Sequence, residues 1–313
     1  MGRTGETGHC RSRSDRRYRI GTWSLNDQGH IAVLSNEVFE NLISTGCRTF
    51  VDATVGAAGH ALGMLVRNRN LHLIGIDRDQ EALDRAGQTL KEYSGRVTLL
   101  RGNFRNLKEI LQGIGISSID GILFDLGISS YQLADSRGFS FNDDEGLDMR
   151  MDTREALTAY EIVNSYRQED IARILYEYGE EHRSRKIAKV IFDSRKKEKI
   201  RTARQLASIV ASAKKRTGRI HPATKTFQAL RIAVNDELGS LAQGMDAAVG
   251  LLAAGGRIGI ITFHSLEDRM VKERFRNDRT LNVLTRKAIK PGREEVLSNP
   301  RSRSAKLRVA EKN

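Results

Sequence analysis

The sequence predicts an α/β fold with a mostly parallel sheet that is interrupted by an inserted helical domain. Over the first third of the chain, short apolar runs rich in β-branched residues alternate with segments of helical periodicity. The alternation stops near Gln132, where polar and charged helical patterns begin, and an apolar strand pattern resumes near Gly256. Because strands that alternate with helices form parallel sheets, this order indicates one sheet whose chain path is broken by an insertion.

The first part of the chain predicts one helix and four strands. Apolar residues recur at helical spacing over residues 34–43, which indicates the helix. The apolar runs at residues 49–55, 71–77, 97–100 and 119–126 predict strands, each followed by a helical pattern. Residues 1–28 are polar, basic and aperiodic, which is typical of a disordered leader.

The later elements divide into an insertion and the rest of the sheet. Polar helical patterns at residues 169–178, 183–195 and 203–215 belong to the insertion. A helix at 241–253 and strands at 256–263 and 305–309 complete the sheet. We therefore expect a discontinuous sheet domain, residues 29–134 and 229–313, and a helical insertion, residues 135–228.

Positive charge is concentrated in one segment. The chain has 52 Lys and Arg against 39 Asp and Glu, a net charge of +13. Residues 182–231 hold 16 of these cations and two acids, so this basic segment accounts for the whole excess. The bias favours a nucleic-acid surface, and a solvated helical face is the alternative. The expected nucleic-acid contacts are Arg195, Lys196, Lys197, Lys199, Lys214, Lys215, Arg216 and Arg219.

Composition excludes several other classes of protein. Cys10 and Cys47 are too few for a disulfide framework, and no Cys/His cluster has zinc spacing, so we expect no metal. No run of about 18 apolar residues is present, and the Arg-rich N-terminus has no apolar stretch behind it. These features predict a cytoplasmic protein without a membrane partner.

The first strand is followed by a glycine-bearing turn, with Gly56 and Gly59 before a helix. Alone, this turn is equally typical of a tight strand-to-helix connection. Asp77 ends the second strand about 20 residues later, where a carboxylate accepts hydrogen bonds from ribose hydroxyls. The G-x-x-G spacing lacks the dinucleotide fingerprint, so we expect a nucleoside cofactor without phosphates. S-adenosylmethionine meets this description.

Asp125 ends the fourth strand and precedes a loop of small residues. Reacting groups in α/β folds lie at this carboxyl edge of the sheet, although a helix N-cap is an alternative role for the carboxylate.

Several longer motifs carry a family resemblance. They occupy residues 120–132, 137–141, 147–152, 178–181, 221–232, 263–269 and 299–304. In this order the chain resembles the MraW/RsmH family from about His30 to its C-terminus. The resemblance implies a Rossmann-like class I methyltransferase fold and transfer of a methyl group from S-adenosylmethionine to N4 of a cytosine in the decoding region of 16S ribosomal RNA. It also implies a small-subunit particle as the partner, and RNA as the ligand of the basic segment.

The resemblance also implies cofactor contacts by particular residues. They are Ala58, Gly59, His60, Asp77, Phe104, Asp125 and Gln132. The family loop is usually richer in glycine than Ala57 and Ala58 make it here. An alanine at position 58 is tolerable only with a negative φ, which puts its backbone contact in question. Tyr131 stands where the family usually has proline before Gln132, which puts the Gln132 contact in question.

The reaction needs an acceptor that localises the amine lone pair, because this pair is delocalised into the cytosine ring. Asp125, Ser129 and Ser130 are the catalytic candidates, with loop carbonyls as the alternative. The extruded base would stack on an aromatic side chain, for which Phe139, Phe141 and Tyr131 are available unless they pack in the core. We expect His221 and His264 to be structural hydrogen-bonding residues.

Two other functions remain compatible with the sequence. One is methylation of another RNA or of DNA by the same core. The other is a non-catalytic RNA-binding assembly protein with the same fold. Binding of S-adenosylmethionine would separate the second from both enzymes.

Overall fold

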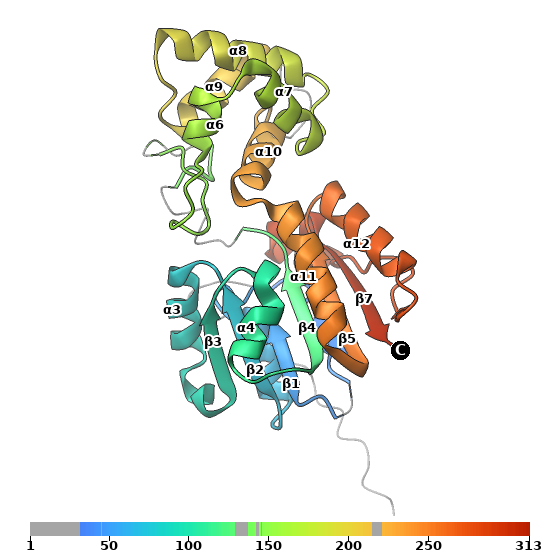
Figure 1. The fold of residues 1–313 in the computed structure, drawn as a ribbon. Helices are drawn as coiled ribbons and strands as arrows, with labels where there is room; N and C mark the ends of the chain where they lie inside the picture. The colour runs from blue at the N-terminus through green and yellow to red at the C-terminus, as the bar shows by residue number, and fades with distance from the viewer. Residues whose placement is uncertain (1–31, 45, 129–136, 142–143, 145, 215–220) are drawn as a thin grey trace, which may run out of the picture.

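The computed structural model describes residues 32–44, 46–128, 137–141, 144, 146–214 and 221–313, and contains a seven-stranded sheet (Figure 1). Strands β1 to β5 pair in parallel, and β7 runs antiparallel to β5 and β6. The strand order is β3-β2-β1-β4-β5-β7-β6. The strands are β1 Thr49–Asp52, β2 His72–Asp77, β3 Val97–Arg101, β4 Ile119–Asp125, β5 Leu252–Thr262, β6 Leu281–Val283 and β7 Lys306–Lys312.

The predicted α/β fold with a mostly parallel sheet is confirmed. All six expected strands form, because their apolar residues are buried by helices on both faces of the sheet. Strand β6 was not predicted, and its three residues are too few to show a period.

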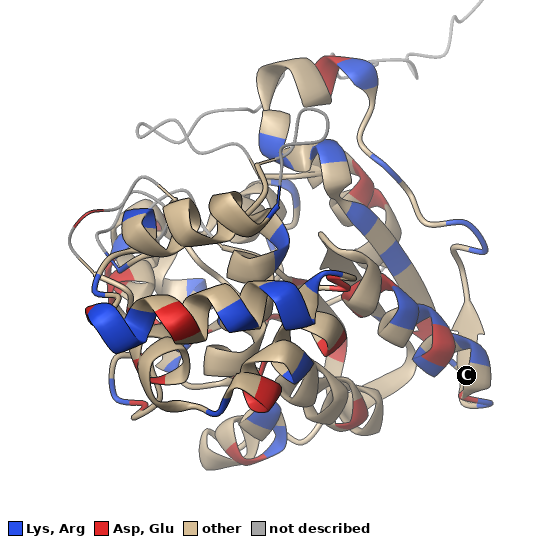
Figure 2. Cartoon of the chain, turned by 90° about the horizontal axis from the view of Figure 1, so that it is seen from above, with Lys and Arg blue, Asp and Glu red and all other residues tan. Residues whose placement is uncertain are grey.

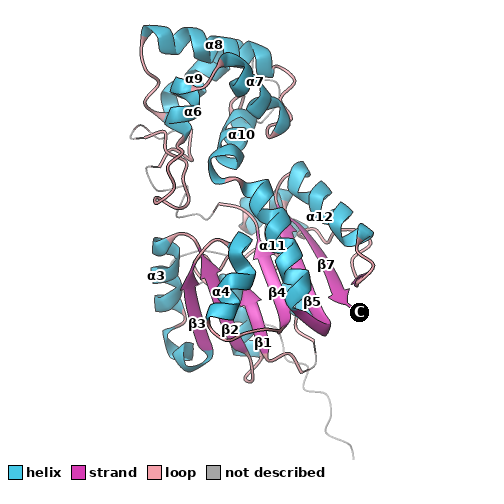
Figure 3. Cartoon of the chain, in the orientation of Figure 1, coloured by secondary structure: helices cyan, strands magenta, loops and turns pink. Residues whose placement is uncertain are grey.

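Helices cover both faces of the sheet (Figure 1, Figure 3). Buried residues of α4, α11 and α12 pack on one face, and those of α1, α2 and α3 pack on the other. The helices are α1 Ser35–Leu42, α2 Gly59–Arg67, α3 Gln80–Thr89, α4 Leu107–Gly113, α11 Glu237–Leu251, α12 Ser265–Asn277 and α13 Arg293–Ser298, with 3-10 turns at Lys91–Arg96, Phe104–Asn106 and Pro300–Ser304.

The helical insertion packs around a hydrophobic core of its own. It contains α6 Ala159–Ser165, α7 Gln168–Glu177, α8 Ser184–Lys197, α9 Ala203–Ala213 and α10 Thr224–Asn235, which lie beyond the carboxyl edge of the sheet (Figure 1). The three helical patterns predicted here are confirmed. Helices α6 and α10 were missed. Thr158 and Glu161 form a capping box at the start of α6.

Helix α10 crosses the expected domain boundary at residues 228 and 229. Ala229, Leu230 and Val234 are buried in the core of the insertion, so the helix cannot be divided there. Asp236 follows with a left-handed φ of 43°, and α11 begins at Glu237. We propose that the insertion ends at Asn235.

Polar contacts join the insertion to the sheet domain. Arg137 pairs with Asp79 at 2.9 Å, and Asp152 pairs with Arg101 at 3.3 Å. Arg78 donates to the carbonyl of Asn235 at 3.2 Å. These bonds hold the loop before α6 and the end of α10 against the residues that follow β2 and the last residue of β3.

Candidate active site

A pocket of about 290 Å³ lies at the carboxyl edge of the parallel strands. Residues that follow β1, β2, β3 and β4 all line it, which is the usual ligand position in an open α/β sheet. It brings together most of the expected cofactor contacts, namely Gly59, His60, Asp77, Phe104 and Asp125.

The Asp77 carboxylate is fixed by two backbone N–H groups. Gly56 donates to Oδ2 at 3.0 Å, and Asp79 donates to Oδ1 at 2.9 Å. Burial raises the pKa of Asp77, and these two hydrogen bonds oppose the rise only in part. Each carboxylate oxygen can still accept a further bond. Asp77 therefore anchors the glycine-bearing turn and presents acceptors to the pocket, as a ribose would require.

Ala58 has a positive φ of 66°, not the negative φ that an alanine favours. The left-handed conformation costs an alanine about 1–2 kcal/mol. The turn imposes it, because the Ala58 N–H donates to the Val55 carbonyl at 2.7 Å while the side chain is fully buried. Ala58 is not among the residues that line the pocket, whereas Gly59 is.

His60 and Asp125 face each other beside the pocket. His60 Nε2 lies 3.5 Å from Asp125 Oδ2. Burial lowers the pKa of His60, but the side-chain contact with Asp125 and the charges of Asp125 and Asp52 raise it by more. Within the described part of the chain, His60 Nε2 and Asp125 Oδ1 are buried without a hydrogen-bond partner. Buried polar atoms normally have partners, so this pair is available to a ligand.

Phe104 contributes an aromatic wall on the side of β3. Its ring meets Phe124 edge to face, with 5.4 Å between the ring centroids. Gly244 of α11 lets the ring approach closely, because a Cβ there would lie 2.7 Å from the Phe104 ring. A side chain at position 244 would not leave this space, so Gly244 helps to hold the Phe104 ring in the pocket wall.

Sequence reasoning missed part of the pocket wall. Glu237 and Glu267, from the first turns of α11 and α12, line the pocket, as do Met151 and Arg301. Residues 147–152, 263–269 and 299–304 were visible as family motifs, but no role followed from them. No sequence pattern marked Glu237 as a pocket residue, because only the tertiary fold shows that the start of α11 reaches the pocket.

Three expected site residues, Ser129, Ser130 and Gln132, lie outside the described residues, as does Tyr131. Phe139 is buried in the core of the insertion. Phe141 stacks on His221 at a centroid distance of 4.7 Å and meets Phe227 edge to face. Both phenylalanines therefore pack within the insertion.

His264 is the N-cap of α12, where its Nδ1 accepts from the Glu267 N–H at 3.4 Å. The expected structural role of His264 is therefore confirmed by this cap.

The basic residues differ in what they contact. Arg195 donates to the carbonyls of Val163 and Tyr166 at 2.7 and 2.6 Å, which satisfies the end of α6. Lys214 pairs with the buried Glu181. Lys196 lies over the Phe192 ring at 4.3 Å.

The remaining expected contacts are divided between exposed and undescribed positions. Lys197 and Lys199 are exposed, whereas Lys215, Arg216 and Arg219 lie outside the described residues. The face of the insertion seen in Figure 2 carries several Lys and Arg positions along its helices. None of the helices in the described part of the chain has the length and apolar character needed to cross a membrane.

A family model and individual relatives both place the chain in the same protein family. The model of the MraW methylase family matches residues 27–313. A ribosomal RNA small subunit methyltransferase H from Sulfurihydrogenibium sp. is 50% identical over 286 residues, covering 90% of this chain and 98% of the relative. The protein of the same name from Persephonella marina is 46% identical over 289 residues, covering 90% and 99%.

Proposed function

The chain belongs to the MraW methylase family, and from this premise we propose that it transfers a methyl group from S-adenosylmethionine to N4 of a cytosine in the decoding region of 16S ribosomal RNA. The names of its relatives support a ribosomal RNA substrate. The proposed partner is a small-subunit particle, and the proposed compartment is the cytoplasm.

The pocket chemistry supports the methyl donor. Asp77 presents carboxylate oxygens at the end of β2, and Phe104 supplies an aromatic wall. The buried atoms His60 Nε2 and Asp125 Oδ1 have no hydrogen-bond partner among the described residues. Together, these polar atoms and the aromatic ring fit an adenosine and an amino-acid group. S-adenosylmethionine would supply an electrophilic methyl group on a sulfonium.

Asp125 carries the proposed chemistry, because its Oδ1 is a buried acceptor at the pocket without a hydrogen bond in the described chain. An acceptor in this position would hold one N–H of the cytosine amine and direct the nitrogen lone pair toward the methyl group. After transfer the nitrogen is cationic and acidic, so Asp125 and His60 need only to accept a proton from a strong acid. Ser129 and Ser130 stay candidates for the same role.

The RNA substrate would be held by the helical insertion. Lys197 and Lys199 are exposed on the insertion, and the target base must leave its stack to enter a pocket of this size. Methylation of another RNA or of DNA, and a non-catalytic assembly role, are the alternatives that the experiment must separate.

The test compares N4-methylcytidine in 16S ribosomal RNA from cells with and without this gene. We expect the modification to be lost at one cytosine without the gene and restored by the purified protein with S-adenosylmethionine. Retention of the modification would reject the proposed substrate. Binding of S-adenosylmethionine without transfer to any nucleic acid would favour the assembly role.

A further inference from the structure

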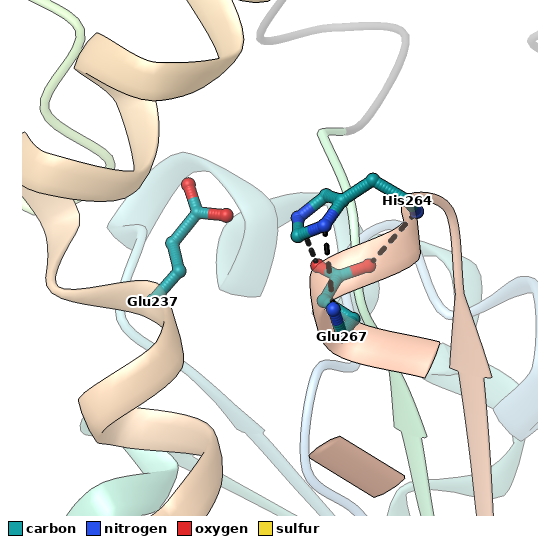
Figure 4. Close-up of side chains that lie close together, drawn as sticks. All are labelled: Glu237, His264 and Glu267. Carbon is teal, nitrogen blue, oxygen red and sulfur yellow. Dashed lines mark hydrogen bonds and ion pairs between the residues drawn. The ribbon is translucent and has the colours of Figure 1, made fainter. Parts of the chain in front are cut away.

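We propose that Glu237 is the specificity-determining residue that accepts a hydrogen bond from the exocyclic amine of the target base and selects cytosine over uracil. The proposal rests on the proposed function and extends it to a part of the pocket that the cofactor contacts do not use. Glu237 lies at the start of α11, and Glu267 lies at the start of α12. Figure 4 shows the Glu237 carboxylate directed toward the pair formed by His264 and Glu267.

The carboxylate of Glu267 is already committed to the protein. Its Oε2 accepts the N–H groups of Phe263 and His264 at 2.9 and 3.3 Å. Its Oε1 lies 3.0 Å from His264 Nε2. The side chain is buried, so these contacts hold α12 in place and leave Glu267 little capacity for a ligand.

The carboxylate of Glu237 is oriented but not saturated. Arg231 donates to its two oxygens through Nε and Nη2, each at 2.8 Å. Among the described residues, these are the hydrogen bonds that the Glu237 carboxylate accepts. A carboxylate has about four lone-pair sites, so acceptor capacity remains on the pocket side. The bidentate pair fixes the direction of that capacity.

The base that fits this wall is one that donates from its exocyclic position. Cytosine presents an N4 amine to an acidic side chain, whereas uracil presents the O4 acceptor. A carboxylate and a carbonyl oxygen repel each other, and Arg231 is held by Glu237 rather than turned to the pocket. Glu237 therefore strengthens the binding of cytosine and weakens the binding of uracil at the same position.

A metal ion is the competing occupant, since ligand atoms of Glu237, His264 and Glu267 lie within 4.8 Å of one another. Imidazole binds a metal through a free nitrogen lone pair. The lone pair of His264 Nδ1 accepts from the Glu267 N–H, which places the proton of a neutral ring on Nε2, toward Glu267 Oε1. His264 is thus better suited to a structural pair than to a metal.

His264 lies behind this wall and packs against Glu267. Its side chain is 8% exposed, and Nε2 has no hydrogen bond of good geometry in the described chain despite its distance of 3.0 Å from Glu267. Asp125 Oδ1 and His60 Nε2, from two residues that line the pocket, are also buried without a hydrogen bond in the described chain. An extruded base offers several donors and acceptors to such a wall.

The experiment measures the affinity of the protein for small-subunit particles that carry cytosine or uracil at the methylated position. Wild type should bind the cytosine particle roughly 10-fold or more tightly, the range for one good base contact. Glu237→Gln should lower this ratio, because an amide can accept from an amine or donate to O4, while the proposed Asp125 contact with the amine remains. Glu273→Gln, on the exposed side of α12, is the matched control and should keep the ratio.

Two further measurements keep the outcomes distinct. The variant Arg231→Met with Glu237→Gln removes both charges of the buried pair, so it tests the ratio without an unpaired Arg231. An unchanged circular dichroism spectrum will show that both variants are folded. A cytosine preference as large as that of wild type in Glu237→Gln and in the double variant overturns the assignment, while methyl transfer by wild type leaves the proposed function intact.

Failure of wild type to methylate any cytosine would overturn the proposed function, and the assignment of Glu237 with it. Titration of the RNA-free protein with Mn²⁺ or Zn²⁺ addresses the competing occupant. Stoichiometric binding that disappears in Glu237→Gln would make this wall a metal site and overturn the assignment. We expect no Glu237-dependent binding.

Discussion

Glu180 of the helical insertion and Arg269 of α12 form an ion pair across the junction with the sheet domain, with 2.9 Å between Oε1 and Nη2. The other carboxylate oxygen of Glu180 accepts from the Ser265 hydroxyl, and the Glu180 carbonyl accepts from Lys225 at 2.7 Å. The insertion is thereby attached to the first turn of α12, next to the residues that line the pocket. A substitution in the insertion that breaks these contacts should therefore affect the first turn of α12 and the neighbouring pocket.

We expect Glu180→Ala to raise the KM for the ribosomal substrate while the affinity for S-adenosylmethionine is unchanged. The Glu180 side chain is 38% exposed, so loss of the pair should cost less than about 1 kcal/mol in the free energy of unfolding. Steady-state methylation and calorimetric titration test the two parts. Glu177→Ala, exposed at the end of α7, is the control. An equal rise in KM for both variants would remove the argument for Glu180.

Asp77 should be needed for binding of S-adenosylmethionine. Asp77→Ala should weaken binding by roughly 1.5 to 3 kcal/mol, the range for losing charge-assisted hydrogen bonds. The substitution also releases the N–H groups of Gly56 and Asp79, so the thermal midpoint should fall as well. Asp77→Asn keeps acceptor capacity and should be intermediate in both measurements. Calorimetric affinity equal to that of wild type would place the ribose elsewhere.

Asp125→Ala separates cofactor binding from alignment of the amine. If Asp125 aligns the amine, the single-turnover rate at saturating S-adenosylmethionine should stay depressed by roughly 10² or more. If Asp125 only holds the cofactor, saturation should restore the rate. The buried, unsatisfied Oδ1 leads us to expect a persistent loss. Full recovery would transfer the role to Ser129, Ser130 or a loop carbonyl.

The strands and the position of Asp77 and Asp125 were predictable, because a buried parallel strand needs a continuous apolar run and its last residue reaches the ligand edge. The roles of Arg195 and Glu237 were not. Arg195 belongs to a basic run in sequence, yet its guanidinium hydrogen-bonds the carbonyls of Val163 and Tyr166, about 30 residues away at the C-terminal end of α6. Glu237 reaches the pocket through the bend at Asp236, whose left-handed φ no periodicity reveals.

The structure changes how the basic segment should be tested. Arg195→Ala alone should lower the free energy of unfolding by roughly 1–3 kcal/mol, because it leaves carbonyls of α6 without their donor. Lys197 and Lys199 are exposed and can be neutralised together without this loss. RNA affinity of that double variant should fall, and the slope of log affinity against log salt should flatten by somewhat under one unit per lost contact.

Lys108→Ala, exposed on α4 of the sheet domain, should leave the salt slope unchanged. Fluorescence titration of the ribosomal substrate at several salt concentrations compares the variants. If the slope of the Lys197 and Lys199 variant equals that of wild type, the exposed end of α8 is a solvated face. Other basic residues, such as Arg301 and Arg303, would then make the RNA contacts.

Asp52 gives the protein a pH-dependent stability. The side chain lies at the end of β1 and is 1% exposed, and burial raises its pKa from 3.8 to about 7. Between about pH 4 and pH 7 the folded carboxyl keeps a proton that the unfolded carboxyl has lost. The contribution of Asp52 to the free energy of unfolding must therefore fall as the pH rises through this window, and level off above it.

Asp52→Asn is neutral at every pH and should remove this contribution. Relative to wild type, we expect the variant to gain roughly 1 to 3 kcal/mol of stability between pH 5 and pH 8, because one pKa unit corresponds to about 1.4 kcal/mol. Urea unfolding at the two pH values measures the difference, with Asp84→Asn on the exposed face of α3 as the control. A difference that is the same at both pH values would mean that Asp52 is ionised in the fold throughout. The charge of His60, which lowers the pKa of Asp52, would then outweigh burial.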